Sequence, residues 1–136
     1  MTGGVILDSC GVGHIVADDA GQIRLEGSYT VGGDAPAHWI AVRSGNIGVP
    51  AVLTGARALS LVGTGGVRTF SSGFATASDT GLVFASSSVL SFSFPSGVVG
   101  ARYAVGGNAV IQTAGSGPTF FPGSVVGTSA SGGQYL

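Results

Sequence analysis

Short apolar runs separated by Gly, Asp and Ser fill this chain, and none of them has the spacing of an amphipathic helix. Glycine recurs too often for a helix to keep one apolar face, and each interior Gly costs a helix about 1 kcal/mol relative to Ala. Val89–Phe94 ends in strict apolar–polar alternation, which indicates a half-buried strand. The pattern predicts an all-β chain with strands at His14–Ala17, Gln22–Leu25, Trp39–Val42, Ala51–Thr54, Leu59–Val62, Phe74–Ala77, Leu82–Ala85, Val89–Phe94, Arg102–Val105 and Ala109–Thr113.

The chain contains an internal repeat. Residues 13–21 align without a gap with residues 73–81, and the same outline begins again at residues 37 and 101. Each unit has a small residue, a ring-bearing residue nearby, a short apolar strand, a turn that ends in Gly, and a second strand. The turn glycines, 24, 36 and 26 residues apart, are Gly21, Gly45, Gly81 and Gly107.

Coils of this length with a glycine at each corner favour a β-solenoid that resembles a right-handed β-helix. Each strand would pair with the coils above and below, and a narrow interior would explain the many Ala, Val and Ser residues. The long interval predicts an insertion around Gly55–Phe70, with a loop at Gly63–Gly66. A β-sandwich stays open as the alternative, because irregular strand spacing near ten residues fits it as well.

Composition excludes several classes of protein. Gly, Ala, Ser and Thr fill 69 of the 136 positions, and five basic residues against six acidic ones leave a net charge of −1. Five scattered arginines make no basic stripe, so we expect no nucleic-acid partner. A chain that is 44% hydrophobic with little net charge does not have the composition of a disordered one. Since Cys10 is the only cysteine, an intrachain disulfide is excluded.

No targeting or membrane-spanning segment is expected. The first residues have neither a basic region nor a long apolar run, so they do not form a signal peptide. Residues 80–101 carry no charge, but their serines and Pro95 are typical of strands and turns rather than of a spanning helix. We therefore expect a soluble protein without membrane insertion.

The C-terminal part has a different character. No charged side chain occurs in the 34 residues from 103 to 136. Its large apolar residues would be exposed on an extended tail, and such patches usually mark an interface. We predict β-helical coils over 1–102 and an uncharged tail over 103–136 that packs against neighbouring chains and covers the end of the stack. A disordered tail stays open as the alternative. The large apolar residues are Phe120, Phe121, Val125, Val126, Tyr135 and Leu136.

The two histidines could suggest a metal site, with Cys10 or Asp34 as further ligands. The spacing of Cys10 and His14 suits a metal on a helix, but this segment is not predicted to be helical. His14 and His38 lie in or beside the ring positions of the repeat, so we interpret them as structural rings. We predict no metal and no cofactor.

Catalytic chemistry finds little support. Asp18, Asp19 and Asp79 lie at equivalent turns, where short acids usually accept hydrogen bonds from backbone N–H groups. A glycoside hydrolase or lyase would need two carboxylates about 5 to 9.5 Å apart, which adjacent chains of a trimer could supply. No serine lies in a nucleophile elbow. We assign no catalytic residue and expect no enzymatic activity.

Aromatic residues near arginines suggest a different kind of site. Trp39 and Tyr103, with Arg43 and Arg102 nearby, suit stacking on the face of a sugar if the rings are exposed. These four residues are the candidate glycan-binding site. The alternative is that at least one ring is buried between coils.

The last third carries a specific string of residues, namely Ala101-Arg102-Tyr103, residues 107–113, residues 115–123, Gly127 and residues 132–135. It resembles the C-terminal region of tail fibre or tail-spike-like proteins of bacteriophages and prophages, which are rich in Gly, Ala and Ser. The likeness runs from about residue 21 to the end. Its most specific parts are Pro122-Gly123 and Gly132-Gly133-Gln134-Tyr135.

The resemblance implies a homotrimeric, β-helical segment of a virion tail appendage, made in the host cytoplasm. Its expected partners are its own copies, other virion tail proteins and a host surface glycan. In that family the region usually ends a longer polypeptide, whereas Met1 precedes the first coil here. An excised fragment and a separately encoded virion protein both stay open. A polysaccharide-degrading tailspike fragment and a capsid decoration protein are the alternative functions.

Overall fold

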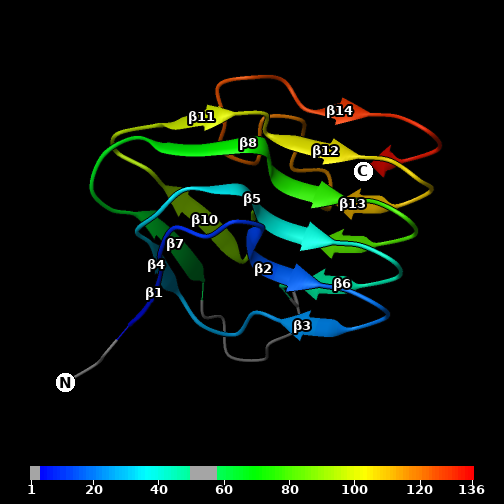
Figure 1. The fold of residues 1–136 in the computed structure, drawn as a ribbon, viewed down its shortest axis with the longest axis horizontal. Helices are drawn as coiled ribbons and strands as arrows, with labels where there is room; N and C mark the ends of the chain where they lie inside the picture. Colours follow the sequence, from blue (N-terminus) through cyan, green and yellow to red (C-terminus); the bar gives the residue numbers. More distant parts are fainter. Residues whose placement is uncertain (1–3, 50–57) are drawn as a thin grey trace.

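Parallel strands from successive coils stack into a β-solenoid of about four coils (Figure 1). The computed structural model describes residues 4–49 and 58–136, and these residues form strands and turns without a helix. Accordingly, no helix in this part of the chain could span a membrane. The predicted solenoid is confirmed. The β-sandwich alternative is wrong, because the strands pair in parallel with the coils before and after them.

Three sheets run along the stack. Sheet A consists of β1 (Val5–Leu7), β4 (Tyr29–Val31), β7 (Leu59–Gly63) and β10 (Leu90–Ser93). Sheet B consists of β2 (Gly13–Ala17), β5 (Ala35–Ala41), β8 (Arg68–Ala77), β12 (Tyr103–Val105) and β14 (Thr128–Ser129), with β11 (Val98–Gly100) beside the start of β8. Sheet C consists of β3 (Gln22–Arg24), β6 (Asn46–Gly48), β9 (Leu82–Phe84), β13 (Val110–Gln112) and β15 (Gln134–Tyr135).

The sequence repeat is the repeat of the coils. Gly13 pairs with Ala37, and Ala37 pairs with Gly73, as the alignment predicts. Equivalent positions of sheet C supply one apolar side chain to the core from each coil, because strand residues at the same register point to the same face. This core ladder consists of Ile23, Ile47, Val83, Ile111 and Tyr135.

A tight turn joins sheet B to sheet C in every coil. Its two central residues have positive φ, as in a type I′ turn. Gly21, Gly45 and Gly81 close the first three turns by donating a hydrogen bond to the residue three positions before, so their predicted role is confirmed. In the fourth coil Ala109 takes this place, and Gly107 lies inside the turn. The central pairs are Asp19 and Ala20, Arg43 and Ser44, Asp79 and Thr80, Gly107 and Asn108, and Ser131 and Gly132.

The third coil is longer than its neighbours, as expected. A loop separates Gly63 at the end of β7 from Arg68 at the start of β8, and the pairing of β5 with β8 shifts its register between Ala35 and Ala37. The predicted loop therefore begins after Gly63. The expected strand Ala51–Thr54 and the start of the insertion lie outside the described residues.

The C-terminal segment continues the stack. β12 and β13 extend sheets B and C directly, so no break in the sheets marks residue 102. Residues 114–127 then cross the end of the solenoid (Figure 1) and bury Phe121 completely. The expected exposure of Phe121 in a single chain is therefore wrong, whereas Val125 and Val126 are exposed. Packing of the tail against neighbouring chains stays a prediction.

Candidate functional site

Trp39 and Tyr103 cannot form the expected stacking platform, because both rings are buried. Trp39 is 0% exposed and packs against Phe121 at a ring separation of 5.9 Å. Tyr103 is 7% exposed and stacks on Tyr135 at 3.9 Å. The two rings lie at equivalent positions of sheet B, with Ala75 between them. The prediction of a Trp39–Tyr103 sugar site is therefore wrong, and burial between coils is the correct alternative.

Arg43 lies in the column of tight turns between sheets B and C. Its Nε donates to Asp19 at 2.8 Å, and its Nη2 donates to Asp18. The hydrogen bond to Asp19 and the charges of both carboxylates raise the pKa of Arg43. Asp18 also accepts a hydrogen bond from the backbone N–H of Asp19, which confirms the predicted turn role of that acid. Arg43 thus joins the turns of two coils and takes no part in a common site with Arg102.

The histidines belong to a column of stacked rings, as predicted. The ring centroids of His14 and His38 lie 5.0 Å apart, and those of His38 and Phe74 lie 4.8 Å apart. His38 Nδ1 lies 2.8 Å from His14 Nδ1, and its Nε2 lies 2.8 Å from Tyr29 Oη. Cys10 is exposed, and the described ranges contain no group of three side chains suited to a metal.

Burial fixes the protonation of this column. It lowers the pKa of His38 well below its usual value, lowers that of His14, and raises that of Tyr29. Trp39 Nε1–H donates to Tyr29 Oη at 2.8 Å, which leaves the Tyr29 hydroxyl to donate to neutral His38. His38 then donates through Nδ1 to His14, whose Nε2 is buried and has no partner among the described residues.

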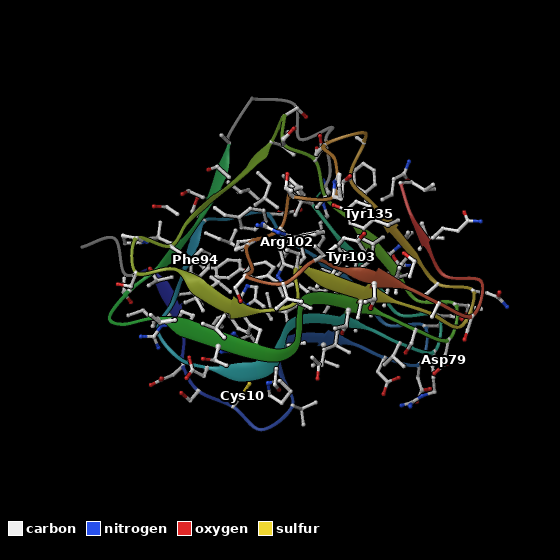
Figure 2. All side chains as sticks on the ribbon, turned by 90° about the horizontal axis from the view of Figure 1, so that it is seen from above. Cys10, Asp79, Phe94, Arg102, Tyr103 and Tyr135 are labelled. Carbon is white, nitrogen blue, oxygen red and sulfur yellow. The ribbon has the colours of Figure 1, made fainter. Side chains whose placement is uncertain are left out.

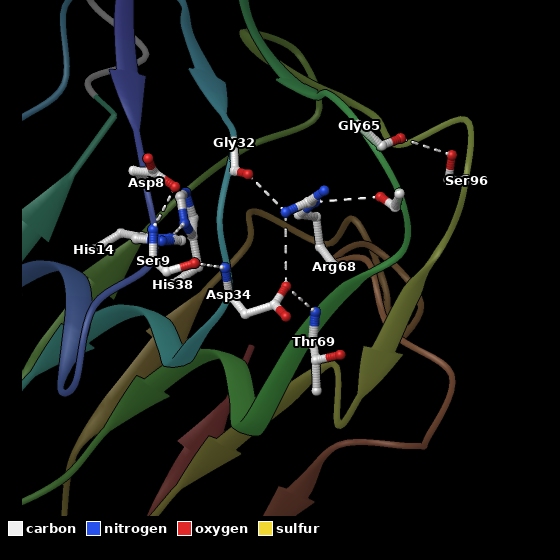
Figure 3. Close-up of polar contacts among 11 residues, drawn as sticks. Asp8, Ser9, His14, Gly32, Asp34, His38, Gly65, Arg68, Thr69 and Ser96 are labelled. Atoms are coloured by element: carbon white, nitrogen blue, oxygen red, sulfur yellow. Dashed lines mark hydrogen bonds and ion pairs between the residues drawn. The ribbon is translucent and has the colours of Figure 1, made fainter.

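A polar cluster beside the histidines joins the second coil to the third (Figure 3). Arg68 donates to the carbonyl of Gly32 at 2.6 Å and lies 3.8 Å from the carboxylate of Asp34. The same carboxylate accepts a hydrogen bond from the backbone N–H of Thr69 at 3.0 Å. Both charged side chains therefore hold backbone in place.

Arg102 differs from the other arginines. Its Nη1 donates to the carbonyls of Phe121 at 2.8 Å and Thr119 at 3.2 Å, and so holds the segment that crosses the end of the solenoid. Arg24, Arg43 and Arg68 each pair with a carboxylate. Within residues 4–49 and 58–136, Arg102 is the one arginine without such a partner.

A hollow of about 450 Å³ lies beside Arg102 at the C-terminal end of the stack. Figure 2 looks down the stack onto this end and shows Arg102 near its middle, with Phe94 to one side. We call it the end hollow. Four of its ten lining residues are phenylalanines and none is acidic: Phe92, Phe94, Gly97, Val98, Arg102, Thr119, Phe120, Phe121, Pro122 and Gly123.

Glycines shape this end of the molecule. A Cβ on Gly123 would lie 2.9 Å from the backbone nitrogen of Arg102, so only glycine lets the crossing segment come this close. A Cβ on Gly127 would lie 2.2 Å from the ring of Tyr103. The Pro122-Gly123 and Gly127 elements of the resemblance therefore build the closed end. These elements were the feature of the sequence that pointed to this end of the molecule. The contributions of Phe92, Phe94 and Phe120 to the end hollow were not predicted.

Comparison with known proteins gives no match, whether to a family model, to a curated protein or to a solved structure.

Proposed function

We propose that this chain is a structural and receptor-contacting segment of a bacteriophage tail fibre or tail spike, that it acts as a homotrimer, and that it has no enzymatic activity. The observation that supports this best is the position of the residues that carry the resemblance. Pro122, Gly123 and Gly127 close the end of the solenoid and form the end hollow with Arg102.

The fold suits a rod. Continuous parallel ladders join every coil to the next, and small residues at the turns let the backbones approach closely. A Cβ on Gly45, for example, would lie 2.0 Å from the carbonyl oxygen of Ala17 in the coil before. Backbone hydrogen bonds along the whole length of the stack, together with one continuous apolar core, suit a stiff rod.

The C-terminal end offers surface for contact with other chains. Val125, Val126 and Leu136 are 56%, 73% and 55% exposed there. Exposed apolar side chains are typical of interfaces when they adjoin one another, and Val125 and Val126 are neighbours in sequence. The partners we propose are two further copies and other tail proteins.

The end hollow is the proposed contact with a host surface glycan. It is open, has phenylalanines in its walls and is charged by a single arginine. A trimer carries three such hollows, and a virion carries several trimers. Weak single contacts then add up, because each bound site raises the effective concentration of the next.

Antibodies against the chain test this proposal on phage particles purified from cultures in which the chain is produced. Labelling of the distal tail in electron micrographs is the expected result. Labelling of the capsid would contradict it and identify a decoration protein. Release of oligosaccharide from host capsule or lipopolysaccharide by the purified chain would contradict the non-enzymatic role.

A further inference from the structure

We infer that the end hollow binds an acidic sugar, with Arg102 pairing with its carboxylate and the phenylalanines packing against its ring. This inference rests on the proposed glycan contact and names the class of glycan.

The charge of the hollow points to an anion. Nη1 of Arg102 is already held by the carbonyls of Thr119 and Phe121, which fixes the plane of the guanidinium group. Nε and Nη2 form one edge of this plane and have no hydrogen-bond partner in the described part of the chain. Two parallel N–H donors on a fixed edge match the two oxygens of a carboxylate.

The aromatic part of the walls suits a ring with apolar faces, while Arg102, Thr119 and backbone line the rest of the hollow. Phe92 and Phe120 pack edge to face with centroids 5.3 Å apart, and Phe94 lines the same hollow. Phe94 is held in place because its ring lies over Gly63, where a Cβ would come within 2.2 Å of it. The C–H faces of a pyranose can pack on such rings while its hydroxyl groups stay in water. A volume of about 450 Å³ is in the range of small-molecule sites.

The number of charges favours a carboxylate over a phosphate. A phosphate monoester carries about −1.5 to −2 charges near neutral pH. Arg102 is the only cation among the lining residues and neutralises one charge. A sugar with one carboxylate is therefore the matched ligand.

Two variants of Thr119 test the inference, because this exposed residue lines the hollow next to Arg102. Thr119→Glu places a competing carboxylate beside the guanidinium group, whereas Thr119→Gln has nearly the same size without the charge. The probes are methyl glucuronide, methyl glucoside and glucose 6-phosphate, titrated into the whole chain and followed by NMR chemical shifts.

We expect methyl glucuronide to shift signals of Arg102 and the lining phenylalanines, and methyl glucoside to bind at least about tenfold more weakly. Thr119→Glu should weaken glucuronide binding by a similar factor, and at least about fivefold more than Thr119→Gln, which changes the same position without adding a charge. Equal binding of the glucoside, tighter binding of the phosphate, or equal effects of the two variants would overturn the inference. Tail labelling without glucuronide binding would overturn this inference alone, and capsid labelling with binding would overturn only the proposed location.

Discussion

A chain of hydrogen bonds runs through the core from Trp39 by way of Tyr29 and His38 to His14. When both histidines are neutral, every donor in this chain except Nε2–H of His14 has an acceptor. Protonation of either imidazole puts a donor where an acceptor is needed and so disrupts the chain of hydrogen bonds. Buried polar networks stabilise a fold when they are satisfied and cost free energy when a charge enters them.

The column predicts a loss of stability in mild acid. The folded state lowers the pKa of His38 below that of the unfolded chain, so the unfolded state binds more protons as the pH falls below about 6.5. The stabilisation is complete above that pH and falls by about 1.4 kcal/mol per pH unit until the folded pKa is reached. His14 and Tyr29 contact His38, and the charges of Asp8 and Asp34 favour a proton on His14.

Urea unfolding between about pH 7.5 and pH 5.5 measures this slope, because the carboxylates titrate mostly at lower pH. His38→Phe places in this position the kind of ring that Phe74 supplies in the next coil. The variant should reduce the pH dependence of the free energy of unfolding by the equivalent of about one bound proton. An unchanged slope in this variant would show that the column does not titrate on unfolding.

The sequence could not indicate that Trp39 is buried together with its neighbour His38. In a straight strand successive side chains point to opposite faces, so burial of one predicts exposure of the next. Both are 0% exposed here, just after the register shift between Ala35 and Ala37. The extra residue of this shift lies in β8, between Phe70 and Gly73, so the shift does not account for the burial of His38. The rings of His14, Phe70 and Phe74 enclose that side chain instead.

At the scale of elements, the tight turns contain residues that do not favour their conformation. Ala20 has a φ of 61°, where a side chain other than Asn, Asp or Gly is strained. We predict that Ala20→Gly raises the free energy of unfolding by about 0.5–1 kcal/mol, because the relief of strain exceeds the added chain entropy of the unfolded state. Urea unfolding of the variant measures this gain.

Ala104→Gly is the matched control, since Ala104 lies in β12 with ordinary strand geometry. There the same change should lower the free energy of unfolding by about 0.5–1 kcal/mol. If both variants changed the free energy of unfolding in the same direction, the strained positive-φ conformation of Ala20 would be contradicted.

Strand prediction succeeded for most of the strands that lie next to the repeated tight turns, where the aligned sequence units mark the positions. The predicted Leu59–Val62 is one residue shorter than β7. The three-residue strands β1, β4, β6 and β11 were missed, although β3, β9, β12 and β13 are just as short and were predicted. The first half of β5 was missed because it contains Pro36, which argues against a central strand.

At the scale of the molecule, Phe121 closes the core. Its ring packs against Phe74, Phe92 and Trp39, with each centroid separation 5.9 Å. We predict that Phe121→Ala lowers the free energy of unfolding by about 3–5 kcal/mol, because it opens a cavity at the end of the stack. Chemical denaturation measures this loss.

Phe120→Ala is the control, since the same ring is only half-buried one residue earlier. Phe120→Ala should lower the free energy of unfolding clearly less than Phe121→Ala does. Proteolysis within residues 114–127 should increase much more in the Phe121 variant. Equal losses would mean that the crossing segment does not close the core.

The number of chains in the assembly tests the central claim most directly. Size-exclusion chromatography with light scattering gives the mass in solution independently of the shape of the molecule. We predict about 40 kDa, three chains of 13.2 kDa each, with the exposed Val125, Val126 and Leu136 protected from solvent. A mass near 13.2 kDa would contradict the trimeric fibre segment.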